Sequence, residues 1–329
     1  MHGGPQALGR RGRRQEDHEG ASGREPAALT PPPASGPPPA DLGDLPVVDH
    51  HCHLSPRGEG VEAARRFARA GGTHLFLATQ QYEPLPPTDL EGYRRQFETT
   101  ESLARSITAS TGVVVYVVVA PYPIDLLGAA DRVGLSKAVD EHEAALDLAG
   151  RFVSEQRAVA IGEVGRPHFP IDPSLAEASE RTFRHALEVA RDVDCPAIVH
   201  CEELDPAGYL ALAHLASQTG IRVNRIVKHF AREVVPIEAR AGVAASFVAR
   251  RPAVSKSLGL PGPWFWETDF LDDPARPGAV LDLETVPRRA RAIAASEGKA
   301  GLEALRTPFE LSIRTVYGFV PEVPGHRPR

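Results

Sequence analysis

Residues 45–53 have the sequence Leu-Pro-Val-Val-Asp-His-His-Cys-His, an apolar run of strand length that ends in polar side chains. Side chains alternate along an extended chain, so Asp49, His51 and His53 are expected on one face, with His50 and Cys52 on the other. Two imidazoles spaced in this way can reach one cation. The alternative is a strand that ends in two solvated histidines, and this segment alone favours neither interpretation.

Segments of strand length recur along the chain and alternate with longer segments of helical spacing. This alternation is typical of βα units around a parallel sheet, and eight strands is the number found in a (β/α)₈ TIM barrel. Segment 112–119 is apolar almost throughout, as expected for a strand that is covered on both faces. The predicted strands are Pro46–His50, His74–Ala78, Gly112–Val119, Ala158–Gly162, Ala197–His200, Arg225–Lys228, Gly242–Phe247 and Trp264–Glu267.

The ends of two helices and one long loop are also indicated. Asp172-Pro173 and Asp205-Pro206 each place a capping acid before a proline suited to the first helical position, and Gly220 ends the second helix. Segment 79–89 contains three prolines and is long enough to be an active-site loop after the second strand.

Five predicted strands end in, or are followed by, side chains that bind metal ions. Taken singly, each histidine could be a core residue with its hydrogen bonds satisfied. A barrel, however, places its active site at the carboxyl ends of its strands, so the coincidence predicts a centre for one or two divalent ions. The mixed imidazole and carboxylate set suits Zn, Mn, Fe or Co ions better than Ca, and Mg is also compatible. The predicted ligands are His51, His53, Glu163, His200, His229 and Asp269.

Four motifs together resemble the TatD-like branch of the amidohydrolase superfamily, and the similarity extends over residues 45–320. They are Asp49-x-His51-Cys52-His53-Leu54, Gly162-Glu163-Val164-Gly165, Pro196-x-x-Val199-His200 and Glu267-Thr268-Asp269. The resemblance implies a metal-dependent hydrolase in which His51, His53 and Asp269 hold one ion, His200 and His229 hold the second, and Glu163 is shared. The run 267–289 is most similar to the archaeal-type TatD relatives.

The chain departs from the pattern of this family in loops that meet the substrate. Segment 120–123 is Ala-Pro-Tyr-Pro where relatives commonly have Gly-x-His-Pro, and segment 228–230 is Lys-His-Phe where relatives have His-Cys-Phe. Glu163 stands where phosphotriesterase-like relatives use a carboxylated lysine, which argues against that branch.

The predicted reaction is hydrolysis by a metal-activated water, on phosphoester bonds as in TatD-like nucleases and phosphodiesterases. Asp269 and Glu163 are the predicted catalytic carboxylates, with Asp269 as the proton acceptor. Glu267 and Asp49 are expected to orient the ligands. Two alternatives remain: a hydrolase of amides, esters or lactones, and a non-catalytic scaffold that binds metal.

Cationic side chains near the strand ends are candidate contacts for an anionic substrate. Arg166 and His168 follow the fourth strand, and Arg250-Arg251 follow the seventh. For each of them the alternative is an ordinary solvated loop charge. The expected substrate is a small molecule or a short nucleic acid, whereas a net charge of −6 argues against a stable nucleic-acid complex.

The composition sets the broad class of protein. Of 329 residues, 42% are hydrophobic and 24% are charged, which is typical of a soluble enzyme. Three cysteines argue against a disulfide framework and favour the cytoplasm, and no apolar stretch is long enough to cross a membrane. Residues 1–44 are rich in Pro, Gly and Arg and predict a disordered tail, while 45–329 predict the hydrolase barrel. Paired arginines near the start are followed by polar residues, which argues against twin-arginine export.

Overall fold

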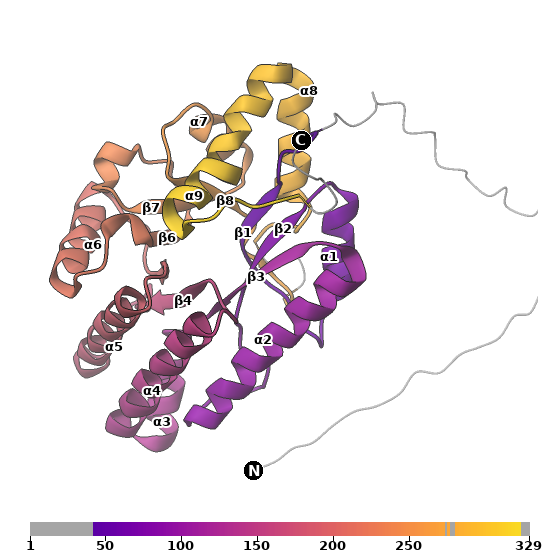
Figure 1. The fold of residues 1–329 in the computed structure, drawn as a ribbon. Helices are drawn as coiled ribbons and strands as arrows, with labels where there is room; N and C mark the ends of the chain where they lie inside the picture. The colour runs from indigo at the N-terminus through magenta and orange to yellow at the C-terminus, as the bar shows by residue number, and fades with distance from the viewer. Residues whose placement is uncertain (1–41, 274, 277–279, 324–329) are drawn as a thin grey trace, which may run out of the picture. The chain divides into compact units, whose positions relative to one another are not determined.

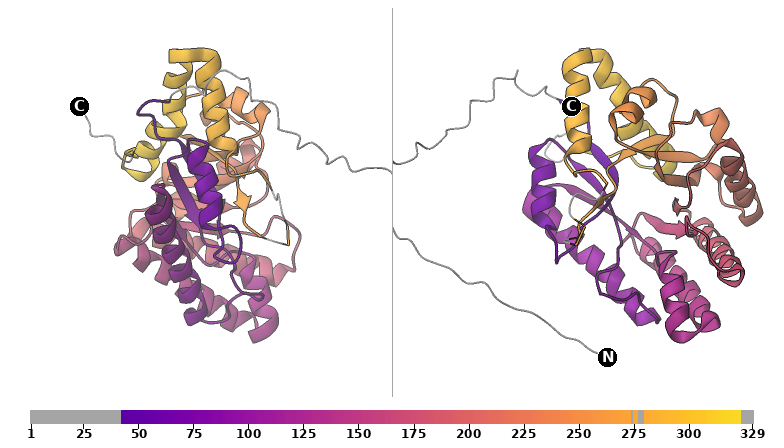
Figure 2. Two further views of the ribbon diagram at one scale, coloured as in Figure 1. Left: turned by 90° about the vertical axis from the view of Figure 1, so that its right-hand side faces the viewer. Right: turned by 180° about the vertical axis from the view of Figure 1, so that it is seen from behind.

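The computed structural model describes residues 42–273, 275–276 and 280–323, and the predicted tail lies almost wholly outside these residues. Within them, parallel strands form one curled sheet with helices on its outside (Figures 1 and 2). Chain neighbours pair from β1 to β8, as expected for a TIM barrel. The strands are β1 Val48–His53, β2 His74–Ala78, β3 Val114–Val119, β4 Ala160–Gly165, β5 Ala197–His200, β6 Ile226–Ala231, β7 Ala244–Val248, β8 Trp264–Glu267 and β9 Phe270–Leu271.

The barrel closes through a strand that is divided into two parts. β8 pairs with β7, whereas β9, two residues further along the chain, pairs with β1 through Cys52 opposite Phe270. Thr268 and Asp269 lie between the two parts, and the Asp269 N–H donates to the carbonyl oxygen of His51. The sequence predicted the first part but not β9, because a pair of apolar residues after an acid carries no strand periodicity.

Strands β2, β5 and β8 begin and end where the sequence predicted. Four others continue past their predicted ends, β7 by the single residue Val248. In β1, β4 and β6 the extension places His51, His53, Glu163 and His229 inside the strands. The predictions stopped at the change from apolar to polar side chains. Backbone pairing with neighbouring strands continues beyond that change, because it depends on the peptide groups and not on the side chains.

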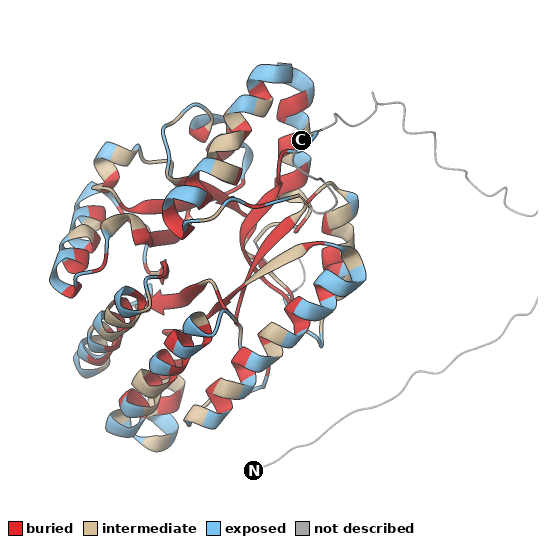
Figure 3. Cartoon of the chain, viewed as in Figure 1, coloured by how far each residue is buried: buried red, intermediate tan, exposed pale blue. Residues whose placement is uncertain are grey.

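Helices cover the outer face of the sheet, and their exposed sides point away from it (Figure 3). Asp205 caps α6 by accepting from the Gly208 N–H, and Gly220 ends that helix with a φ of 80°. Asp172 precedes α5 as predicted but makes no capping hydrogen bond with its side chain. The α-helices are α1 Val61–Arg69, α2 Leu90–Thr111, α3 Asp125–Val133, α4 Leu135–Ser154, α5 Pro173–Asp192, α6 Pro206–Thr219, α7 Arg251–Ser257, α8 Thr285–Arg306 and α9 Ser312–Tyr317.

The βα alternation weakens after the fifth unit. β6 is followed only by the short 3₁₀ turn Ile237–Arg240, and β7 only by the seven residues of α7. The carboxyl ends of β6 and β7 are therefore bordered by short loops.

Side chains from successive residues of a strand enter different parts of the core. In β2, Leu75 and Leu77 pack in a cluster with helix residues such as Phe97 of α2, while Phe76 packs against His50 of β1 and Tyr116 of β3. This division matches a barrel strand with one face on the helices and the other in the interior. No helix among the described residues has the length and apolar character needed to cross a membrane.

Candidate metal centre

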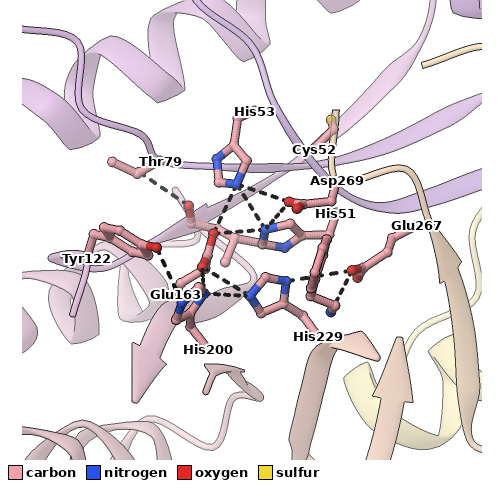
Figure 4. A network of polar contacts seen from close by, with 12 residues as sticks. His51, Cys52, His53, Thr79, Tyr122, Glu163, His200, His229, Glu267 and Asp269 are labelled. Atoms are coloured by element: carbon pink, nitrogen blue, oxygen red, sulfur yellow. Dashed lines mark hydrogen bonds and ion pairs between the residues drawn. The ribbon is translucent and has the colours of Figure 1, made fainter. Parts of the chain in front are cut away.

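Glu163 lies at the centre of four imidazoles, each from a different position on β1, β5 or β6 (Figure 4). Its Oε1 atom is 3.0 Å from the Nε2 atoms of both His51 and His53. Its Oε2 atom is 2.8 Å from Nδ1 of His200 and 3.1 Å from Nε2 of His229. The two carboxylate oxygens thus face two separate pairs of ring nitrogens, and the atoms within each pair are 3.1 Å apart.

Asp269 completes the group on the side of His51 and His53. Its Oδ1 atom lies 3.6 Å from Nε2 of His53 and 3.8 Å from Nε2 of His51. The backbone of Asp269 has a φ of 47°, a left-handed conformation that costs a non-glycine residue energy and is concentrated at functional sites. The structure therefore brings together all six residues that the sequence predicted as ligands.

These side chains lie where the strand pairing is irregular. The register shifts between Asp49 and Cys52 in β1, between Gly162 and Val164 in β4, and between Lys228 and Ala231 in β6. Such irregularities redirect side chains and are frequent next to active sites. In β1 the shift also alters the predicted alternation: His50 stacks on Phe265 beside Phe76, whereas Cys52 packs in the cluster that faces the helices.

The atoms of this cluster suit a divalent cation. Two ring nitrogens that face each other at 3.1 Å can share only one proton, yet both pairs also face a buried carboxylate. A cation between each pair and Glu163 satisfies all of these lone pairs at once, which is the usual fate of a buried cluster of this chemistry. Two sets of side chains, His51–His53–Asp269 and His51–Glu163–His229, have atoms close enough to hold an ion.

In the metal-free protein, the contacts within the cluster shift the pKa values of its carboxylates and imidazoles. Burial alone would raise the pKa of Glu163, but His229, His200 and His51 hold it well below its ordinary value. Burial alone would lower the pKa values of His53 and His229, but Asp269 and Glu163 raise the first to about 10, and Glu163 and Glu267 raise the second to about 9. An incoming cation therefore has to displace protons, so its affinity should fall at low pH.

Two buried carboxylates hold the backbone around the cluster. Asp49 accepts from both the N–H and the hydroxyl of Thr268, at 3.0 and 2.6 Å, and burial raises its pKa to about 8. Glu267 accepts from the Phe230 N–H at 2.6 Å, and its Oε1 atom lies 3.7 Å from Nδ1 of His229. The sequence predicted an orienting role for both acids. Asp49 acts through the backbone next to Asp269, and Thr268, which the sequence did not single out, is its partner.

The side chains predicted to contact the substrate differ in whether another side chain already pairs with them. The Arg166 guanidinium pairs with Glu180 and Glu202, so its charge is already compensated. Nδ1 of His168 lies 2.9 Å from Nε2 of His200. Arg250 lines a cavity of about 410 Å³ together with Glu203, Arg232, Glu233, Pro252 and Ala253, residues that follow β5, β6 and β7.

Tyr122 lies in the loop after β3, and Asp125 is the first residue of α3, which follows this loop. The Tyr122 hydroxyl lies 3.4 Å from Nε2 of His200, and Asp125 is buried. Burial raises the pKa of Asp125 to about 7, with a smaller contribution from the charge of Glu163. The folded protein therefore keeps this proton to a higher pH than the unfolded chain does.

We expect Asp125→Asn to remove one source of pH-dependent instability. Because the folded-state pKa of Asp125 lies above its ordinary value of 3.8, stability decreases as pH rises from about 4 to about 7. Each pKa unit corresponds to about 1.4 kcal/mol, so the effect is on the order of a few kcal/mol. Urea unfolding of the metal-free protein across this range should show a smaller decrease for the variant. Asp131→Asn, at an exposed position of the same helix, is the control, and identical pH slopes for wild type and Asp125→Asn would contradict this account.

Comparison with known proteins agrees with this geometry. Residues 48–316 match the family described as TatD related DNase. The chain belongs to this family. An uncharacterized protein of Methanocaldococcus jannaschii is 30% identical over 256 residues, which are 76% of this chain and 88% of that protein.

Solved structures support the assignment of the fold. The TatD-like protein of Archaeoglobus fulgidus superposes with a TM-score of 0.54 at 14% identity, over 83% of this chain and 100% of that chain. The TatD homologue of Escherichia coli K12 gives 0.52 at 17%, over 83% and 98% of the two chains. A phosphotriesterase-like lactonase variant from Deinococcus radiodurans gives 0.52 at 16%, over 85% and 97%. The relative from Methanocaldococcus agrees with the predicted similarity to archaeal-type TatD proteins.

Proposed function

We propose that this TatD-family protein is a two-metal hydrolase that cleaves phosphoester bonds in a small molecule or a short nucleic acid. The observation that carries the proposal is the position of Glu163, whose two oxygens face two separate groups of imidazoles. The family description, TatD related DNase, supports phosphoester chemistry. In this proposal His51, His53 and Asp269 would hold the first ion, His200 and His229 would hold the second, and Glu163 would offer one oxygen to each.

The roles of the carboxylates follow from how exposed each side chain is. Divalent ions bound here would supply an activated water and polarise the bond that is cleaved. Asp269 is the carboxylate best placed to take and return a proton, because its side chain is 16% exposed while those of Glu163 and Glu267 are 5% and 0% exposed. Glu163 keeps its negative charge and fixes the two ligand groups relative to each other.

The cavity beside the ends of β5, β6 and β7 offers a place for an anionic part of the substrate. The Arg250 side chain makes no hydrogen bond or ion pair with the described residues, and the guanidinium of Arg232 contacts Glu203 at 3.5 Å. Guanidinium groups bind phosphate and carboxylate oxygens well. Hydrolysis of lactones or amides remains the competing outcome, and a substrate screen separates it from phosphoester cleavage.

Replacing His51 and His53 together by alanine should abolish the first metal site. Both rings point Nε2 at the same oxygen of Glu163, and Asp269 alone cannot replace two imidazole ligands. Elemental analysis should then find about one ion fewer per chain than in the wild type. The double variant His185→Ala/His214→Ala removes two histidines from α5 and α6 and should keep full occupancy. Unchanged metal content in the His51/His53 variant would show that the centre lies elsewhere.

A further inference from the structure

His200 differs from the other imidazoles of the cluster in how it is held. Its side chain is 14% exposed, compared with 0% for His51, 10% for His53 and 2% for His229. It faces Glu163 through Nδ1, whereas the other three rings use Nε2. The outer nitrogen of His200 is therefore Nε2, and this more exposed ring depends more on a partner for its orientation.

The outer nitrogen of His200 has a close partner in His168. Nδ1 of His168 lies 2.9 Å from Nε2 of His200, while the Tyr122 hydroxyl is 3.4 Å away. A ring that binds a cation through Nδ1 carries its proton on Nε2 and donates it to an acceptor. Among the described side chains, the outer Nδ1 atoms of His51, His53 and His229 have no hydrogen-bond partner. The outer Nδ1 atom of His229 lies 3.7 Å from Oε1 of Glu267, beyond hydrogen-bond distance, so among the described ligands His200 is the one whose outer nitrogen has a side-chain hydrogen-bond partner.

The loop after β4 packs closely against the backbone of His200. Gly165 has a φ of 130°, and a Cβ at this position would collide with the His200 carbonyl oxygen. This close approach allows the Arg166 N–H to donate to the same carbonyl at 3.0 Å. The Arg166 guanidinium then pairs with Glu180 of α5 and with Glu202, two residues after His200.

These contacts form a continuous connection from α5 to the imidazole of His200. The ion pairs of Arg166 fix the start of the loop, and the loop presents His168 two residues later. Contacts within the protein therefore account for the orientations of both Arg166 and His168. A role in positioning this ligand accounts for the geometry without any bound substrate.

We propose that the segment Arg166–His168 is a clamp that orients His200 and so sets the affinity of the second metal site, the one formed by His200, His229 and Glu163. The inference rests on the proposed two-metal function. The first site draws on four side chains, His51, His53, Asp269 and Glu163, while the second draws on three and includes the most exposed ring. The second ion is therefore the weaker one, and its retention depends on His168.

Titration of metal-free protein with Co²⁺, followed by calorimetry and by the visible spectrum of the bound ion, tests the clamp. The wild type should show two binding events. His168→Phe should weaken the second event by about 10- to 100-fold, the usual effect of removing a partner of a metal ligand, and should alter its spectrum. The first event should stay unchanged. His168→Asn, whose side-chain oxygen can replace Nδ1 as the acceptor, should restore both the affinity and the spectrum.

Two further variants make the outcome unambiguous. His185→Phe, a matched change at a histidine of α5 that pairs with Asp147, should leave both events intact. The event weakened by His168→Phe should be the one that survives in the His51/His53 double variant. Equal weakening of both events, or no change in either, would overturn the clamp while leaving the two-metal proposal in place. A wild type that binds no ion, or only one, would overturn the proposed function and the clamp with it.

Discussion

Glu163→Gln should weaken the binding of both metal ions and abolish measurable turnover. The substitution keeps the size of the side chain but removes the charge that faces His51 and His53 at 3.0 Å and His200 at 2.8 Å. A neutral amide has one oxygen and one NH₂ group, so at best one of the two ligand groups keeps an oxygen donor. Because the carboxylate is shared, a single change should affect both sites, unlike a change in any one histidine.

Metal content and catalytic rate of this variant should be measured on the same preparation. We expect metal content to fall below that of the wild type and the rate to fall to that of the buffer, with the secondary structure unchanged by circular dichroism. Glu101→Gln, at a glutamate of α2 that pairs with Arg157, is the matched control and should behave like the wild type. Retention of two ions by Glu163→Gln would exclude a bridging role, and full turnover with two ions bound would also exclude a catalytic one.

Asp269→Asn should slow turnover by about 10²- to 10⁴-fold, the typical contribution of general acid–base catalysis. The amide keeps the size of the side chain but cannot accept a proton at neutral pH. Three observations single out this residue: its carboxylate is the most exposed of those in the cluster, its backbone is held by His51, and its neighbour Thr268 is held by Asp49.

Metal occupancy decides how a slow Asp269→Asn enzyme is interpreted. A slow variant that keeps its ions supports proton transfer by Asp269, while a slow variant that has lost the first ion supports only a ligand role. Asp273→Asn, at a partly exposed acid paired with Arg276, controls for the loss of a nearby charge. Turnover close to that of the wild type with both ions present would transfer the role of base to another group, and Glu267 would be tested next.

The positions of the metal ligands could be predicted because their signals are local. An apolar run of strand length followed by an acid or a histidine marks Glu163, His200 and His229 without knowledge of any other part of the chain. The barrel rule then brings these strand ends to one face, since all of its strands are parallel. The same rule places His51 and His53 beside them.

The finer arrangement could not be predicted because it depends on contacts between distant residues. Asp49 and Thr268 are separated by 219 positions, and no periodic pattern links them. The register shifts in β1, β4 and β6 come from the pairing of neighbouring strands, which side-chain periodicity does not describe. The contact of His168 with His200 likewise depends on the close approach that Gly165 allows.

The most direct test of the central claim is the rate of phosphodiester cleavage by protein stripped of metal and then reloaded with Mn²⁺, Zn²⁺, Mg²⁺ or Co²⁺, measured beside amide and lactone substrates. The account predicts that the stripped protein is inactive, that one or more of these ions restores cleavage of the phosphodiester, and that maximal rate requires about two ions per chain. Cleavage of lactones or amides with no activity on any phosphoester would contradict the proposed chemistry, and a rate that does not depend on metal would contradict the proposed centre.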